Sequence, residues 1–193
     1  MKICVFAASS DHLEEIYLDA AGEVGRLLGQ SGHTLIFGGG RTGLMGACAR
    51  GALESGAEII GIAPRFFDEP GVLYGQCSRF VWTDTMAERK TAMEEEADGF
   101  LVLPGGIGTM EEYFEVLTLR QLGLHAKPIA LLNTAGYFDA LAAFLRAMAG
   151  QGFAGHEVPA LSPLCDTPAE ALHALTDAPH RTASGCSKAG YFR

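Results

Sequence analysis

The residues with the clearest chemical potential lie in one short segment, in which three of the four residues 105–108 are glycine. The apolar run at residues 99–103 predicts a buried strand before them, and residues 113–122 predict an amphipathic helix after them. A strand, a glycine turn and a helix present free backbone N–H groups and a positive helix end to an anion. We therefore expect a phosphate at this turn, with the carboxylate of Glu112 beside it.

The same segment permits a purely structural interpretation. Thr109 and Glu112 have the spacing of a capping box, in which Thr109 is the N-cap and Glu112 folds back onto its N–H group. The glycines would then only permit a tight turn. Three glycines exceed what one turn needs, and a second glycine-rich junction lies earlier in the chain, which favours the anion site.

The earlier junction is the sequence Gly-Gly-Gly-Arg-Thr-Gly at residues 38–43, between a predicted strand and a predicted helix. Its glycines fit the pattern G-x-G-x-x-G, and Glu58 follows about twenty residues later, as in dinucleotide sites. That fingerprint usually follows the first strand of its unit, whereas this one follows the second. We interpret it as a second phosphate or ribose cradle with contacts from Gly39 and Arg41. The alternative is that the glycines only let the helix pack closely on the sheet.

Other polar residues allow two interpretations each. Ser9 follows the first predicted strand, where it would either cap the next helix or hydrogen-bond a ligand at the mouth of a parallel sheet. Arg89 and Lys90 begin one turn into a predicted helix, where the helix dipole does not favour cations, so simple solvation is the alternative for both. The six histidines are scattered, and none lies beside an obvious nucleophile, so no Ser-His or Cys-His machinery is predicted.

Strands and helices alternate along the chain. Apolar runs predict strands at residues 2–8, 33–37, 58–63, 79–82, 99–103, 127–133 and 160–164. Helical periodicity predicts helices at about residues 12–30, 44–55, 85–97, 113–122, 137–150 and 168–175. The fold class is therefore α/β, a Rossmann-like doubly wound parallel sheet with helices on both faces. Its carboxyl edge would gather Ser9, residues 38–43 and residues 105–112 into one crevice, with the loop 68–78 as a cover.

Composition sets the remaining limits. A chain of 193 residues suits one domain, which we place at residues 1–181, with a loose polar tail at 182–193. The net charge of −9 argues against nucleic acid as a partner, but not against a small phosphorylated ligand. The five cysteines form no metal-spaced cluster, so we expect no metal site and a reducing cytoplasm. No apolar run approaches the roughly 20 residues of a membrane span, so we expect no membrane partner.

Two motifs carry a family resemblance. Residues 104–112 fit P-G-G-x-G-T-x-x-E, and residues 86–90 fit M-x-x-R-K. Together with residues 38–40, 43–46, 121–123 and 127–128, they make nearly the whole chain resemble the Lonely Guy family of phosphoribohydrolases, long mislabelled as lysine decarboxylases. The resemblance implies a cofactor-free, Rossmann-like homodimer. It would hydrolyse the N-glycosidic bond of cytokinin riboside 5′-monophosphates, and of AMP, to free base and ribose 5-phosphate.

The resemblance also assigns roles. Arg89 and Glu112 match the catalytic pair of the family. The positions matching substrate contacts are Lys90, Gly106, Gly108, Thr109 and Thr118, and Gly105 belongs to the same loop. Three departures leave base specificity open. Ala-Ala-Ser-Ser at residues 7–10 replaces a frequent Cys-Gly-Ser-Ser, Thr-Met-Ala at residues 85–87 replaces Asp-Met-His, and a binding glutamate of the variable loop has only Glu69 as a possible counterpart.

The residue types suit this reaction. Breaking a ribosyl C–N bond develops positive charge on the sugar, which the Glu112 carboxylate would stabilise while it orients or activates water. The 5′-phosphate would anchor the sugar on backbone amides, and Arg89 would position the substrate and interact with the purine as negative charge develops there. No histidine is evident as the acid for the leaving base, so its protonation stays open.

Two rival functions need different features. A non-catalytic carrier of nucleotide or molybdenum cofactor on the same fold would keep the phosphate cradle without needing both Arg89 and Glu112. An NAD(P)-dependent enzyme using residues 38–43 would lack the first-strand fingerprint. Lysine decarboxylation typically uses pyridoxal phosphate on a Schiff-base lysine, and no sequence feature marks one.

Overall fold

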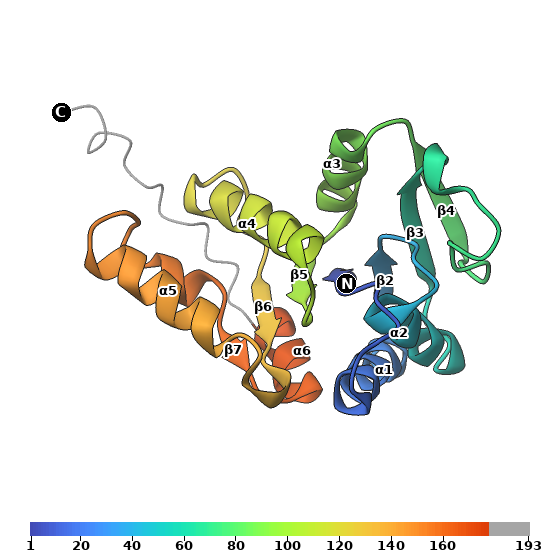
Figure 1. Ribbon diagram of the computed structural model, residues 1–193, viewed down its shortest axis with the longest axis horizontal. Coiled ribbons are helices and arrows are strands. Elements are labelled where there is room, and N and C mark those ends of the chain that lie inside the picture. Colours follow the sequence, from blue (N-terminus) through green and yellow to red (C-terminus); the bar gives the residue numbers. More distant parts are fainter. Residues whose placement is uncertain (178–193) are drawn as a thin grey trace.

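Seven parallel strands form the centre of the computed structural model, which describes residues 1–177 (Figure 1). They are β1 (Lys2–Phe6), β2 (Thr34–Phe37), β3 (Ile59–Pro64), β4 (Arg79–Thr83), β5 (Gly99–Val102), β6 (Ile129–Leu132) and β7 (Leu164–Cys165). Their order across the sheet is β4-β3-β2-β1-β5-β6-β7, and each neighbouring pair is parallel. The predicted Rossmann-like parallel sheet is confirmed.

The first strand, β1, lies in the interior of this sheet, and later strands are added on both sides of it. Val5 of β1 lies opposite Phe37 of β2 on one side and opposite Leu101 of β5 on the other. From β1 the chain moves outward through β2, β3 and β4, and then returns to β5 and moves outward through β6 and β7. The strand order therefore reverses between β1 and β5. In open α/β sheets, ligands bind outside the carboxyl ends of the strands at such a switch point.

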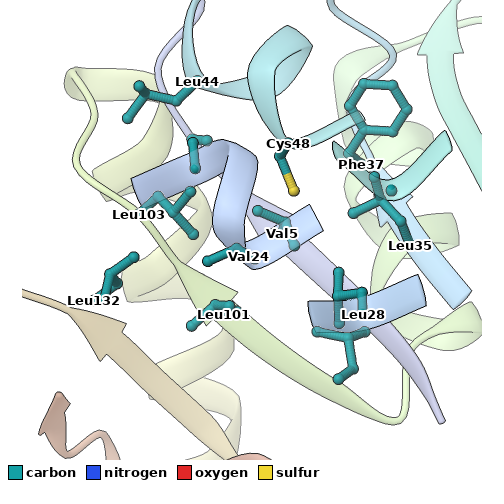
Figure 2. Close-up of a cluster of buried hydrophobic side chains, with 14 of the residues drawn as sticks. Val5, Val24, Leu28, Leu35, Phe37, Leu44, Cys48, Leu101, Leu103 and Leu132 are labelled. Atoms are coloured by element: carbon teal, nitrogen blue, oxygen red, sulfur yellow. The ribbon is translucent and has the colours of Figure 1, made fainter. Parts of the chain in front are cut away.

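Helices cover both faces of the sheet. The first face carries α1 (Glu15–Gln30), α2 (Gly43–Glu54) and α6 (Pro168–Thr176), and the second carries α3 (Met86–Glu96), α4 (Ile107–Gln121) and α5 (Asp139–Gly150). Because side chains alternate along a strand, Ile3 and Val5 join the first core, whereas Cys4 and Phe6 join the second. Figure 2 shows the first core, where Val24 and Leu28 of α1 lie against the strands. Burial on both faces explains why the strands are continuous apolar runs.

A glycine contact brings α1 and α2 together. A Cβ on Gly25 would overlap the carbonyl oxygen of Cys48 and lie 2.6 Å from the amide nitrogen of Ala52. Only glycine therefore permits this close approach of the two backbones. At the start of α2, the N–H of Leu44 donates to the carbonyl of Ala8 at 2.9 Å, which ties that helix to the end of β1.

Three boundaries differ from the prediction. The first helix begins at Glu15 rather than near residue 12, and α4 begins at Ile107, within the glycine segment itself. The strand predicted at 160–164 is wrong in its position, since residues Val158–Leu161 form a 3₁₀ turn and β7 is Leu164–Cys165. Pro159 explains the turn, because its fixed φ suits the first turn of a helix and it has no N–H for a sheet ladder.

Two predictions concern residues that the structure does not describe. The proposed domain boundary at 181 and the tail at 182–193 lie outside the described residues. In residues 1–177, no helix combines the length and apolar character required to cross a bilayer.

Candidate active site

The loops after β1 and β5 meet at the switch point. The N–H of Ala8 donates to the carbonyl of Pro104 at 3.2 Å, which joins the two loops. Directly after Pro104 the chain turns through Gly105 and Gly106, and Gly106 is the N-cap of α4 with no side-chain cap of its own. The first amides of an α-helix have no intrahelical partner. The helix therefore presents the N–H groups of Ile107, Gly108 and Thr109 at the switch point, and Gly106 and Gly108 are exposed.

The capping-box interpretation of this segment is wrong. Thr109 lies inside α4 rather than at its N-cap, and its side chain is buried against Gly105. Glu112 does not fold back onto Thr109, because it is paired with Arg89. Nη1 of Arg89 donates to Oε1 of Glu112 at 2.6 Å, and Nε of Arg89 donates to the carbonyl of Ile62 at 3.2 Å.

Arg89 and Glu112 form a buried ion pair between α3 and α4. Arg89 is only 7% exposed and Glu112 only 9%. The guanidinium group lies against the backbone at Gly38, where a Cβ would overlap Nη2 of Arg89. Gly38, the first residue of the glycine triplet after β2, thus leaves room for Arg89. The alternative of surface solvation for Arg89 is excluded by its burial.

Glu112 combines an altered acidity with a free oxygen. Burial raises the pKa of Glu112, and the positive charge of Arg89 opposes this shift only in part. Among residues 1–177, Oε2 of Glu112 has no hydrogen-bond partner, and it retains contact with solvent. The carboxylate therefore keeps one oxygen on Arg89 and offers the other to a ligand. Burial and the nearby Glu112 also raise the pKa of the Cys4 thiol well above its ordinary value, so Cys4 is uncharged and adds no nucleophile.

Lys90 of α3 contacts the outer face of α4, and Thr118 belongs to that face. Nζ of Lys90 pairs with Oε1 of Glu111 and, at 3.0 Å, with Oε2 of Glu115. Thr118 is exposed one turn beyond Glu115. It follows Thr109 by nine residues, about 13 Å along the helix axis. The structure therefore does not bring Thr118 to the amides at the start of the same helix.

The first glycine junction is closed by the chain itself. Gly39, with φ +77°, packs under the ring of Phe80, and its carbonyl accepts from the N–H of Tyr74 at 2.8 Å. The N–H of Arg41 donates to the carbonyl of Val72 at 3.0 Å, while the Arg41 residue is exposed. Residues 72–74, in the segment between β3 and β4, therefore lie against residues 39–41. That the loop 68–78 covers a ligand stays a prediction.

Two residues at this edge were not assigned these roles from the sequence. Oδ1 of Asp11 accepts from the N–H of Gly43 at 3.1 Å and so occupies the start of α2. The hydroxyl of Tyr137 donates to the carbonyl of Gly105 at 2.6 Å. Ser9 lies beside Asp11, and its carbonyl accepts from the Thr42 hydroxyl at 2.7 Å. In the described part of the chain the Ser9 hydroxyl has no partner, so it is open to a ligand. No periodicity or motif signals the Asp11 and Tyr137 contacts, because each depends on the sheet order.

The arrangement suits a phosphorylated sugar. Ile107, at the start of α4, and Glu112 are separated by about 7.5 Å along the helix axis, which is comparable to the length of a ribose 5-phosphate. Backbone amides and the helix dipole would hold the phosphate, and the carboxylate would face the other end of the sugar. An ionised oxygen at that point stabilises positive charge on an anomeric carbon.

Two of the solved structures with a similar fold are molybdenum cofactor proteins. The carrier protein from Chlamydomonas reinhardtii superposes with a TM-score of 0.71 over 91% of this chain and 96% of its own, at 22% identity. The molybdenum cofactor binding protein from Rippkaea orientalis superposes with a TM-score of 0.65 over 89% and 91%, at 17% identity. At these identities the likeness shows the fold alone.

Sequence relatives show the family. A family model described as "possible lysine decarboxylase" matches residues 45–175. The cytokinin riboside 5′-monophosphate phosphoribohydrolase LOG2 of Arabidopsis thaliana is 38% identical over 152 residues, 79% of this chain and 71% of LOG2. The probable enzyme LOGL2 of Oryza sativa subsp. japonica is 35% identical over 176 residues, 91% of this chain and 72% of LOGL2. The resemblance found in the sequence is confirmed, and the chain belongs to the family of the cytokinin riboside 5′-monophosphate phosphoribohydrolases LOG.

Proposed function

We propose that this chain hydrolyses the N-glycosidic bond of cytokinin riboside 5′-monophosphates and of AMP, giving the free base and ribose 5-phosphate. The observation that carries the proposal is the buried Arg89–Glu112 pair, with one free carboxylate oxygen, a helix turn or more beyond the open N-terminus of α4. The activities for which the relatives LOG2 and LOGL2 are named support the same reaction.

The substrate would be anchored by its 5′-phosphate. The N–H groups of Gly106, Gly108 and Thr109 surround the start of α4, where no side chain of the described chain caps the helix. Amides at a helix N-terminus bind phosphate without needing a lysine or arginine, which suits a protein with a net charge of −9. Gly105 shapes the same turn. The exposed hydroxyl of Ser9 lies across the switch point and would contact the sugar or the base.

Glu112 would act on the anomeric carbon. As the C1′–N9 bond lengthens, positive charge on the ribose is stabilised by the free oxygen of the carboxylate. Water then adds its oxygen to C1′, and Glu112 accepts the proton that the water loses. The departing purine gains one proton, so the sum of the reaction is the addition of one water molecule.

Arg89 would position this carboxylate and interact with the substrate. Its bonds to Glu112 of α4 and to the carbonyl of Ile62 in β3 hold the guanidinium group in place and fix Oε1, which leaves Oε2 free for the ligand. Lys90 would act indirectly, through its ion pairs with Glu111 and Glu115. We assign Gly39 and Arg41 to the rim of the site under the same proposal.

The assembly and location are also proposals. We infer a homodimer in which the outer face of α4, with Thr118 and the half-exposed Leu122 next to it, lies near the partner. Light scattering after size-exclusion chromatography would measure the mass directly. We infer a cytoplasmic location, since Cys4, Cys48, Cys77 and Cys165 are free thiols that suit a reducing compartment.

A substrate panel tests the proposal. Purified protein is incubated with AMP, N6-isopentenyl-AMP, CMP, GMP and adenosine, and the free base and ribose 5-phosphate are quantified by chromatography. We expect release from the two adenine nucleotides and much slower release from adenosine, because adenosine lacks the anchor. Binding of AMP without any release of base would favour a non-catalytic nucleotide carrier, for which the Arg89–Glu112 pair has no need.

A further inference from the structure

Tyr137 makes an unexplained contact with the phosphate turn. It follows β6 and donates its hydroxyl hydrogen to the carbonyl oxygen of Gly105 at 2.6 Å. The residue is 45% exposed, and its ring stands edge-on to the rings of Tyr17, at 6.1 Å between centroids, and Phe138, at 5.0 Å. The hydroxyl therefore reaches from one strand end to the loop of the neighbouring strand, and neither catalysis nor the core requires it.

The turn that carries Tyr137 is held rigidly. Asn133 is buried, and its Oδ1 accepts from the N–H of Phe138 at 2.8 Å while its Nδ2 donates to Oδ1 of Asp139 at 2.9 Å. Ala135 has φ +52°, in the left-handed region that non-glycine residues seldom occupy. Such a conformation persists only where surrounding contacts hold it, and the hydrogen bonds of the buried Asn133 hold this turn next to Tyr137.

The contact with Tyr137 orients the peptide that follows Gly105. β5 lies between β1 and β6, so its loop has a neighbour on each side (Figure 1). The carbonyl of Pro104 accepts from Ala8 on the β1 side, and the carbonyl of Gly105 accepts from Tyr137 on the β6 side. In a trans peptide the N–H points opposite to the C=O. The N–H of Gly106 is therefore directed away from the Tyr137 hydroxyl.

Because both residues are glycine, the orientation of the Gly105–Gly106 peptide can change easily. Rotation of the peptide between Gly105 and Gly106 changes ψ of one glycine and φ of the other, and neither has a Cβ to resist the change. A rotated peptide would present a carbonyl oxygen to the phosphate in place of the N–H donor. A hydrogen bond to the Gly105 carbonyl opposes that rotation.

We propose that Tyr137 is a positioning residue for the 5′-phosphate, which acts by holding the Gly105–Gly106 peptide with its N–H facing the ligand. The proposal rests on the proposed function in one respect, namely that the ligand carries a phosphate at the start of α4. Tyr137 itself does not touch the reacting atoms. Its effect is confined to ligands with a phosphate, since a riboside or a free base has nothing for the Gly106 N–H to bind.

The test compares Tyr137→Phe with Tyr17→Phe. The first removes only the hydroxyl that reaches Gly105, and the second removes a neighbouring tyrosine hydroxyl without a bond to the loop. We measure kcat and KM for AMP, and inhibition constants for ribose 5-phosphate and adenine. For Tyr137→Phe we expect KM for AMP and the inhibition constant of ribose 5-phosphate to rise about threefold to tenfold, as for loss of one hydrogen bond. We expect kcat and the inhibition constant of adenine to change less than about twofold, which is a smaller change than the loss of one hydrogen bond produces.

Other outcomes have definite meanings. Equal weakening of ribose 5-phosphate and adenine would overturn the proposal, because it indicates general distortion, and so would unchanged constants for both. A lower folded fraction leaves KM and the inhibition constants unaffected, so partial misfolding does not obscure the result. If the wild-type protein releases no adenine, the proposed function fails instead. The dissociation constant of ribose 5-phosphate, measured by calorimetry on both variants, then still decides the role of Tyr137.

Discussion

Replacing Glu112 with glutamine separates the two consequences of its buried pair with Arg89. Glutamine keeps the shape and an oxygen that still accepts from Arg89, but it leaves the guanidinium charge buried without its counter-ion. Removing one partner of a buried pair destabilises proteins by about 3–5 kcal/mol. Because the raised pKa of Glu112 means that the fold favours its neutral form, and because glutamine keeps the acceptor, Glu112→Gln should cost less than about 3 kcal/mol. For a chain of this size, that corresponds to a fall in Tm of less than about 12 °C.

The loss of activity should greatly exceed the loss of stability. The neutral amide stabilises no positive charge on the ribose and accepts no proton from water, so we expect kcat for adenine release from AMP to fall about 10²- to 10⁴-fold. AMP binding, measured by calorimetry below the Tm of the variant, should persist, because the phosphate amides are untouched. Glu95→Gln, on the exposed surface of α3, makes the same chemical change without the buried pair and serves as the control. Turnover within about tenfold of wild type would refute the role of Glu112.

Three other results follow from the same geometry. Burial raises the pKa of Glu112, and its carboxylate is the active form. The apparent pKa of the acid limb in a plot of kcat against pH should therefore lie above about 4.3, the pKa of a free glutamate. The same shift makes the contribution of Glu112 to the free energy of unfolding decline as pH rises through its folded pKa. Gly38→Ala should displace the guanidinium group of Arg89 and lower kcat for AMP about 10²-fold, whereas Gly22→Ala, whose Cβ would meet only ordinary contacts at 3.7 Å and beyond, should retain activity. Thr167→Ala removes the capping box of α6, which follows the edge strand β7, and should cost about 1 kcal/mol, seen as a fall of about 2–4 °C in Tm with unchanged kcat.

The parallel sheet was predictable because local signals agree with the fold. Continuous apolar runs of a few residues, separated by helical periodicity, leave few alternatives to a sheet buried on both faces. The glycine turn was predictable only in part, since Gly105 and Gly106 form the turn, whereas Ile107 and Gly108 already belong to the first turn of α4. The short β7 was misplaced because Pro159 and Pro163 interrupt a pattern that the apolar residues alone suggest.

The contacts within the site were not predictable from local patterns. Thr109 and Glu112 fit a capping box, and only the third dimension shows that Arg89, which is 23 residues away, takes the carboxylate instead. The spacing of residues along one helix cannot indicate which side chain of another helix will face it. Tyr137 is further still from its partner, 32 residues, and its contact depends on β6 being next to β5. The family motif pointed to Arg89 and Glu112, but it gave no geometry.

The two glycine-rich junctions also show why a glycine turn before a helix does not by itself define an anion site. Both α2 and α4 begin at the carboxyl edge of the sheet, with amides and a positive dipole end. At α2 the carboxylate of Asp11 already binds the N–H of Gly43, so the helix carries its own anion. At α4, within the described chain, no side chain caps the helix and no acidic residue lies in its first turn. A phosphate would have to displace Asp11 at the first junction, whereas at the second it meets unpaired amides. The physical difference between the sites is therefore the position of one carboxylate, and it directs the ligand to the helix that carries Glu112.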